Sequence, residues 1–416
     1  MRSTPQKSTI VVGAGVIGTA IAYDLQKRGR SVTLIDSAVP GSGASFGNMA
    51  SIAVTEFMPI ARPAVWRQIP KWVLDPAGPI RLSPMYMPKL MPWFLRFLGA
   101  SRPSAVRRIE RAGAALCKRA LGDTQALMAE IGIAHELSKT GCISLYASEA
   151  EFKADQDRVG MLDRFRFEYS VLEGDAIRDL EPEITPDMQK AVLLPNNRTI
   201  ADPQNYVSQL VTAFSSIGGE VYRDIVVGFE VSDRVRGVSL ARGQTLLADE
   251  VVLCAGAQTG RLSKMLGEPI PLETERGYHT HIMAPNIGLR HSFIWPARAF
   301  MVSPTAGGIR VGGTVEMAGL DAAPNYQRAE LTAKRARIAL PNLQLKETTQ
   351  WMGHRPALPD TVPILSASAK VKGLFYATGH GHLGVTQAAT SALLMGELIV
   401  DGNTDFDITP YRVDRF

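Results

Sequence analysis

Three glycines and an aspartate near the start of the chain have the types and spacing to hold a phosphorylated ligand. Gly13, Gly15 and Gly18 form a G-x-G-x-x-G motif, and Asp36 lies 18 residues beyond the third glycine. Such glycines permit a tight turn, the approach of a pyrophosphate to the backbone, and close packing of a helix on a strand. A carboxylate at Asp36 suits a ribose 2′-hydroxyl and repels a 2′-phosphate. These residues therefore predict a site for an adenine dinucleotide.

The surrounding residues predict the elements that position this motif. Residues 9–12 are apolar enough for a buried strand, and a helix is expected from the last glycines to about Arg28, with Gly29 ending it. Residues 31–35 predict a second strand, which leads directly into Asp36. A glycine-rich turn in an unrelated α/β fold is the alternative, but it gives that carboxylate no role. NAD and FAD both satisfy the pattern.

Later segments of the chain favour FAD. Residues 40–52 form a loop of small residues, and strand-to-glycine patterns return only at 246–257 and 373–402. A nucleotide-binding fold assembled from three distant pieces fits the long flavin dinucleotide, whereas an NAD dehydrogenase needs a second nicotinamide-binding half that is not found. A helix is expected from about Val385, and the N–H groups and dipole at its start suit the N1–C2=O edge of a flavin. An ordinary buried C-terminal helix is the alternative.

The whole chain resembles a known family. It is similar to the FAD-dependent amino acid oxidoreductases of the D-amino acid oxidase type. Within that family it resembles the branch of bacterial proteins that are similar to the small subunit of D-amino acid dehydrogenase. The resemblance runs nearly end to end and rests on motifs that occur in this order: VVGAGVIGTAIAYDL, SFGNMASI, ADPQNYV, ADEVVLCAGA, ERGYH, WMGHRPALPDTVPIL and GHGHLGVT.

The resemblance implies a set of contacts to FAD. These are Gly13, Gly15, Val16, Ile17, Gly18 and Asp36 for the ADP half, Ser45 and Asn48 along the pyrophosphate and ring, Val226 through its backbone at the adenine, Gly256 after its strand, and Gly381, Leu383, Gly384 and Val385 beside the isoalloxazine. The three cysteines, Cys117, Cys142 and Cys254, lie outside the GHRP and GHGHLG motifs, so we expect non-covalent FAD.

Three further residues are candidates for the substrate site. Arg355 stands in a mostly apolar G-x-R-P setting, where the family places its carboxylate-binding arginine and where a guanidinium suits a bidentate anion. An ion pair with Asp360 is the alternative. Tyr278 is the candidate for a second contact to the carboxylate or amine, with a core tyrosine as its alternative. His382 is a candidate for shaping substrate choice, or else a structural histidine. The histidines lack the partner spacing of a metal site, so no metal is expected.

By this resemblance the reaction is oxidative deamination of a D-amino acid, with D-proline or hydroxy-D-proline among the candidate substrates. The α-hydrogen leaves as a hydride for FAD N5, and the electrons pass to a quinone or another acceptor. One alternative is a sarcosine- or glycine-oxidase-like enzyme that oxidises small secondary amines with oxygen. Another is a non-catalytic flavin-binding subunit of a larger dehydrogenase.

The predicted fold class is α/β, α+β overall, with two discontinuous domains. A Rossmann-like FAD-binding domain takes residues 1–55, 198–274 and 351–416, and a substrate domain built on an antiparallel sheet takes 56–197 and 275–350. Further expected elements are helices at 104–131, capped by Ser104, at 203–216 and at 328–338, and a hairpin tip at 305–308.

Composition bounds the partners and the compartment. A net charge of +5 over 416 residues is too mild to argue for nucleic acid. Three scattered cysteines make no disulfide framework, and the first residues lack the apolar core of a signal peptide, so a cytoplasmic protein is expected.

One segment, residues 62–119, is basic and aromatic, with twelve Lys and Arg against Asp75 and Glu110, and with Trp66, Trp72 and Trp93. It fits a helical cap or lid on the substrate domain. It also fits a surface for the inner membrane or for a partner that accepts electrons.

Overall fold

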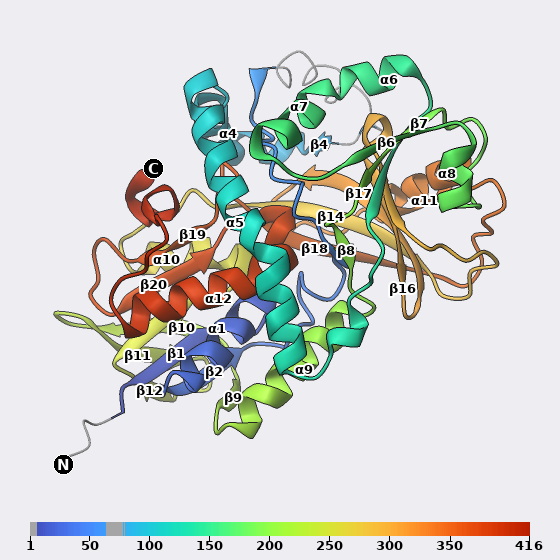
Figure 1. Ribbon diagram of the computed structural model, residues 1–416. Coiled ribbons are helices and arrows are strands. Elements are labelled where there is room, and N and C mark those ends of the chain that lie inside the picture. The colour runs from blue at the N-terminus through green and yellow to red at the C-terminus, as the bar shows by residue number, and fades with distance from the viewer. Residues whose placement is uncertain (1–5, 64–77, 79) are drawn as a thin grey trace.

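The computed structural model describes residues 6–63, 78 and 80–416, and two large sheets organise them (Figure 1). The first sheet has six strands in the order β19-β20-β13-β1-β2-β9. These strands are β1 Ser8–Val12, β2 Ser31–Asp36, β9 Glu220–Arg223, β13 Glu250–Leu253, β19 Ile364–Ala367 and β20 Leu374–Thr378. Five run parallel and β19 runs antiparallel to β20, so the carboxyl ends of β1, β2, β13 and β20 share one edge.

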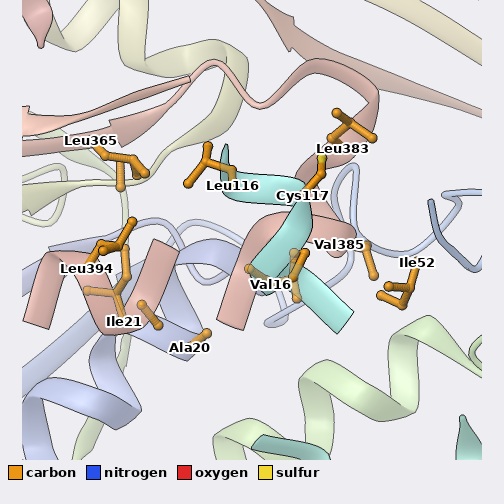
Figure 2. Close-up of a cluster of buried hydrophobic side chains, with 14 of the residues drawn as sticks. Val16, Ala20, Ile21, Ile52, Leu116, Cys117, Leu365, Leu383, Val385 and Leu394 are labelled. Carbon is orange, nitrogen blue, oxygen red and sulfur yellow. The ribbon is translucent and has the colours of Figure 1, made fainter. Parts of the chain in front are cut away.

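Three helices build the core beside this sheet. α12 (Gly384–Val400) contacts both α1 (Val16–Lys27) and α5 (Pro103–Glu130). Figure 2 shows their apolar side chains meeting, among them Ile21, Leu116 and Leu394. With the preceding turn η5 (Gly381–Leu383), α12 is long and apolar enough to cross a membrane. However, 72% of its most apolar window is buried inside the fold, as in a core helix.

The second sheet has nine strands, in the order β18-β14-β17-β16-β15-β5-β7-β6 with β4 beside β17. These strands are β4 Ile80–Leu82, β5 Cys142–Tyr146, β6 Ser170–Glu173, β7 Lys190–Leu194, β14 Glu273–Ile282, β15 Ser292–Trp295, β16 Phe300–Thr305, β17 Gly308–Met317 and β18 Thr348–Ala357. Most pairs are antiparallel, but β5 pairs with β15 and β4 with β17 in parallel. The sheet is therefore mainly antiparallel, as predicted, with two parallel pairs.

Smaller elements complete the fold. Two more sheets hold β10 Val226–Val231, β11 Val235–Leu240 and β12 Thr245–Leu247, and the pair β3 Ser51–Ile52 and β8 Arg198–Thr199. The other α-helices in the described ranges are α4 Met87–Ala100, α6 Glu149–Ala154, α7 Gln156–Phe165, α8 Asp175–Leu180, α9 Pro203–Ser216, α10 Thr259–Met265 and α11 Gln327–Ala339. α11 packs on β14 and β17.

Two local predictions agree with these bounds and one does not. α9 has the predicted ends, and its cap is Asp202, whose side chain accepts two backbone N–H groups. The hairpin turn between β16 and β17 also falls at the predicted residues. The prediction of Ser104 as a helix cap is wrong. α5 begins at Pro103 with Arg102 at the N-cap, because proline is favoured at the first helical position.

The division into two domains stays a prediction, and one of its boundaries differs from the sheets. The sequence placed residues from 351 onward with the FAD-binding part, but β18 pairs with β14 along its whole length in the second sheet. Pro356 is tolerated there because β18 is an edge strand, where a missing N–H breaks no ladder. The G-x-R-P motif therefore lies on a strand and not in a turn.

Candidate active site

The glycine-rich turn lies at the shared carboxyl edge of the parallel strands. Gly13 has φ +107°, and a Cβ there would lie 2.5 Å from the Cys254 carbonyl oxygen at the end of β13. A Cβ on Gly18 would lie 1.9 Å from the Gly13 carbonyl oxygen. Only glycine fits at either position, so the turn is as tight as a pyrophosphate-binding turn requires.

Asp36 lies against this turn. Its carboxylate accepts the Ala14 N–H at 2.7 Å and the Ala38 N–H at 2.9 Å, which leaves further lone pairs for a ribose hydroxyl. The Asp224 N–H donates to the Asp36 carbonyl at 2.9 Å, which brings the chain entering β10 at Val226 to the same edge. Ile17 lies in the first turn of α1, directly after Val16.

The small-residue loop crosses the start of α1. The Val16 N–H donates to the Ser45 hydroxyl at 2.9 Å, so this hydroxyl lies at the helix N-terminus where a phosphate would bind. Asn48 uses its side-chain amide within the loop. It donates to the Ser45 carbonyl at 2.6 Å and accepts the Ala50 N–H at 2.7 Å. Asn48 therefore fixes the loop beside the cofactor site.

The glycine-rich corner between β20 and α12 completes this edge. Gly256 and Gly381 both have positive φ, and a Cβ on either would meet nothing within 4 Å. The Thr378 hydroxyl donates to the Gly256 carbonyl at 3.2 Å, so the ends of β13 and β20 adjoin. α12 then starts at Gly384 with Leu383 as an N-cap that makes no side-chain bond, and Val385 in its first turn. Its N–H groups and dipole fit an anionic ring edge, so the residues at this edge fit FAD.

One face of β14 and β18 looks toward the small-residue loop. His279 on β14 is buried, and its ring Nδ1 lies 2.9 Å from the Gly47 carbonyl. Trp351 on β18 stacks on His279 with ring centroids 5.3 Å apart, and a Cβ on Gly47 would lie 2.2 Å from the Trp351 ring. The second sheet therefore packs directly on the loop that adjoins the cofactor edge.

Arg355 lies on this same face. It is directly opposite Glu275 in the pairing of β18 with β14, and its guanidinium packs on Gly277, where a Cβ would lie 2.5 Å from Cζ. Its side chain donates to the Thr314 carbonyl at 3.4 Å. Burial lowers the pKa of Arg355, and the charge of Glu275 opposes that shift. Asp360, the partner considered from the sequence, instead pairs with Arg415 at 2.8 Å.

Tyr278 lies on the opposite face of β14, because successive side chains of a strand alternate. It is buried, and its hydroxyl donates to Glu316 at 2.5 Å and accepts the Asn325 N–H at 3.1 Å. Burial raises the pKa of Tyr278 to about 12. The structure does not bring Tyr278 to Arg355, so the core-tyrosine alternative replaces its role as a substrate contact.

The two histidines of the corner differ. His382 is exposed on η5, and its Nε2 lies 3.0 Å from the Glu56 carbonyl. His380 is buried, with Nε2 3.0 Å from the Ser391 hydroxyl, and burial lowers its pKa to about 3. Within residues 6–63, 78 and 80–416, no group of three His, Cys, Asp or Glu side chains is placed to hold a metal.

Sequence reasoning missed Glu275 and Trp351, which the structure places on the face of Arg355. Glu275 stands in the ERGYH motif, where an acid enters an otherwise buried strand. The alternation of that strand puts Glu275, Gly277 and His279 on one face. That period-two pattern is the signal that could have identified the glutamate.

Comparison with known proteins identifies the family of the chain. Residues 8–398 match the family described as "FAD dependent oxidoreductase". A D-amino-acid oxidase of Bradyrhizobium diazoefficiens is 30% identical over 98% of both chains, and a D-amino acid dehydrogenase of Dechloromonas aromatica is 28% identical over 94% of this chain and 96% of its own.

Solved structures share the fold. Glycine oxidase from Geobacillus kaustophilus superposes with a TM-score of 0.78 at 21% identity, covering 99% of this chain and 100% of its own. L-proline dehydrogenase from P. horikoshii superposes with a TM-score of 0.76 at 19% identity, covering 99% and 98%. The chain belongs to the family of FAD-dependent oxidoreductases, which confirms the predicted cofactor and fold class.

Proposed function

We propose that this protein oxidises the α-amino group of a D-amino acid, with FAD as its cofactor. The observation that carries the proposal is Arg355, a guanidinium on the face that looks toward the cofactor loop. Within the described part of the chain it forms no salt bridge, and Asp360 is bound to Arg415 instead. A substrate carboxylate would supply the planar anion that this guanidinium suits. The named D-amino acid oxidase and dehydrogenases among the relatives support an amino acid donor of D configuration.

The protein's part in this chemistry is to bind and orient. Arg355 would hold the carboxylate, and that anchor would direct the α carbon toward the edge formed by the small-residue loop and η5. The start of α12 would stabilise negative charge at that edge. FAD, when bound, supplies the hydride acceptor.

An anaerobic titration of the FAD-loaded protein tests the proposal. The panel holds D- and L-forms of alanine, proline and hydroxyproline, together with glycine and sarcosine. Bleaching of the flavin bands by D-amino acids and not by their L-forms is the expected result. Bleaching by sarcosine or glycine alone would favour the sarcosine- or glycine-oxidase-like alternative. A yellow protein that none of them bleaches would favour a non-catalytic subunit.

We also propose that the electrons pass to a membrane quinone and that α4 rests on the inner membrane as a peripheral contact. The outer face of α4 exposes Met91 and Leu95, with Lys89 and Arg96 also exposed beside them. Its inner face packs on the substrate sheet, where the Trp93 Nε1–H donates to the Ala357 carbonyl at 3.2 Å, at the end of the strand that carries Arg355. Exposed apolar residues flanked by cations suit an anionic bilayer. Trp66, Trp72 and Asp75 of the same predicted segment lie outside the described residues.

Vesicle sedimentation tests this contact. The protein should sediment with vesicles that contain phosphatidylglycerol and much less with phosphatidylcholine alone, and Leu95→Glu should abolish the difference. Leu247→Glu, at an exposed leucine on β12, is the matched control and should not change binding. Equal sedimentation of the two variants would exclude α4 as the contact.

Reoxidation of the reduced protein by air as fast as by a soluble quinone would argue against a quinone acceptor.

A further inference from the structure

Glu275 is a buried carboxylate whose charge has no bonded partner in the described part of the chain. Eight aspartates and glutamates are buried there, and seven have a hydrogen bond or an ion pair. Those seven are Asp24, Glu110, Glu181, Asp224, Glu250, Glu268 and Glu316. Glu275 is 8% exposed and has none. A buried charge without a bonded partner destabilises the fold. Such a charge is typical of a functional site, where a ligand supplies the missing partner.

The position of Glu275 specifies the ligand. It is directly opposite Arg355 in the antiparallel pair, where Cβ atoms are about 5 Å apart and both side chains leave the same face. The two groups act on each other through charge, but no hydrogen bond or ion pair joins them. A buried cation and a buried anion, close but not bonded, are complementary to a small zwitterion.

We infer that Glu275 binds the α-ammonium group of the substrate while Arg355 binds its carboxylate, and that Glu275 then takes one ammonium proton. In this step an N–H bond of the substrate breaks and an O–H bond of Glu275 forms. No electrons leave the substrate. The products are a neutral amine, whose lone pair can support loss of the α-hydride, and a neutral carboxylic acid. The inference rests on the proposed function, because it requires an amino acid as the substrate.

The electrostatics of the site agree with a proton acceptor. Burial raises the pKa of Glu275, while the charges of Arg355 on β18 and His382 on η5 oppose that shift. At the start of the same strand, Glu273 is held by the Tyr86 hydroxyl at 2.9 Å. A raised carboxyl pKa brings the acid closer to the basicity that proton transfer near neutral pH requires.

Glu275→Gln in the FAD-loaded protein tests the inference. At pH 7 the variant should keep its flavin spectrum, bind a D-amino acid more weakly, and reduce its flavin roughly 100-fold more slowly under anaerobic conditions. The rate should rise about tenfold per pH unit, because the variant depends on free amine from solution. Pyruvate has the carboxylate but no amine. It should perturb the flavin spectrum of the variant at the same concentration as in the unsubstituted protein, or at a lower one. Glu273→Gln is the matched control on the same strand and should leave amino acid binding, the reduction rate, its pH dependence and the pyruvate response unchanged.

Three results would overturn the inference. The first is an unaltered rate and pH profile in Glu275→Gln. The second is an equal loss of pyruvate and amino acid binding, which would mean that Glu275 only supports Arg355. The third is a loss confined to D-arginine and D-lysine, which would mean that it recognises a cationic side chain. If the unsubstituted protein is not reduced by any amino acid, the proposed function itself has failed, so the two failures are distinguishable.

Discussion

At the scale of single residues, the proposed binding of substrate depends on where Arg355 holds its guanidinium. That group packs on Gly277, whose missing side chain leaves the space. Gly277→Ala should displace it and weaken one charge-assisted contact of about 1.5–3 kcal/mol, which corresponds to a roughly 10- to 100-fold higher Kd for a D-amino acid. The Kd is measured by anaerobic spectral titration.

Gly288→Ala is the control for this substitution, because a Cβ at that position meets nothing within 4 Å. It should leave both the FAD content and the Kd unaltered. An unchanged Kd in Gly277→Ala would show that the guanidinium is not in the position that binds substrate.

Residue identities were predictable to different extents. Arg355 was identified from its motif, and the structure places it on the face toward the cofactor loop. Tyr278 was identified from its chemistry, but its strand face was not considered. In a strand buried on both sides, polarity does not reveal which face lies toward the cofactor loop, so only the pairing with β18 places Glu275, and not Tyr278, on the face of Arg355.

At the scale of elements, the turn between β1 and α1 requires its glycines. Gly18→Ala places a Cβ 1.9 Å from the Gly13 carbonyl oxygen and should shift α1 away from β1. The variant is expected to purify with little FAD, as measured by the ratio of flavin to protein absorbance. Gly122→Ala, at an open helical position in α5, should keep FAD and gain up to about 1 kcal/mol of stability. A Gly18→Ala protein with a full complement of FAD would contradict this role of the turn.

The elements near the start of the chain followed from local sequence, but β18 did not. The elements within residues 8–36 are a strand, a turn, a helix and a second strand. They depend on neighbours in sequence, so the local pattern predicts them. The motif GHRP contains two residues that usually end strands. Its strand conformation comes from pairing with β14, about 80 residues earlier in the chain, and such tertiary context overrides local preference.

At the scale of the whole molecule, two buried histidines make stability depend on pH. Burial lowers the pKa of His279 and His380 to about 3. An unfolded histidine has a pKa near 6.5, so between these values the unfolded chain binds protons that the folded chain does not. The free energy of unfolding should therefore fall by about 2 kcal/mol for each histidine between pH 7 and pH 5.

Chemical denaturation at pH 7 and pH 5 measures this loss. His380→Gln should remove about half of the part that the two histidines cause. His135→Gln, at an exposed histidine on η2 (Ala134–Glu136), is the control and should leave the loss as it is. A loss of the same size in His380→Gln and in the unsubstituted protein would contradict a neutral, buried His380.

The fold class and the cofactor were predictable because motifs in both halves of the chain specify one edge of one sheet. The arrangement of the second sheet was not, because it joins β5 to β15 across about 150 residues in parallel. Such a long-range contact leaves no local signature in the sequence.

The central claim is that Arg355 holds the carboxylate of a D-amino acid beside FAD. The most direct measurement is an anaerobic titration of the unsubstituted protein and of Arg355→Ala with the same D-amino acid, following flavin absorbance. Both proteins should be yellow. The unsubstituted protein should bleach at low substrate concentration, and the variant only at concentrations at least about 100-fold higher, because a charge-assisted pair is lost. Superimposable titration curves, or a protein that cannot be loaded with FAD, would contradict the claim.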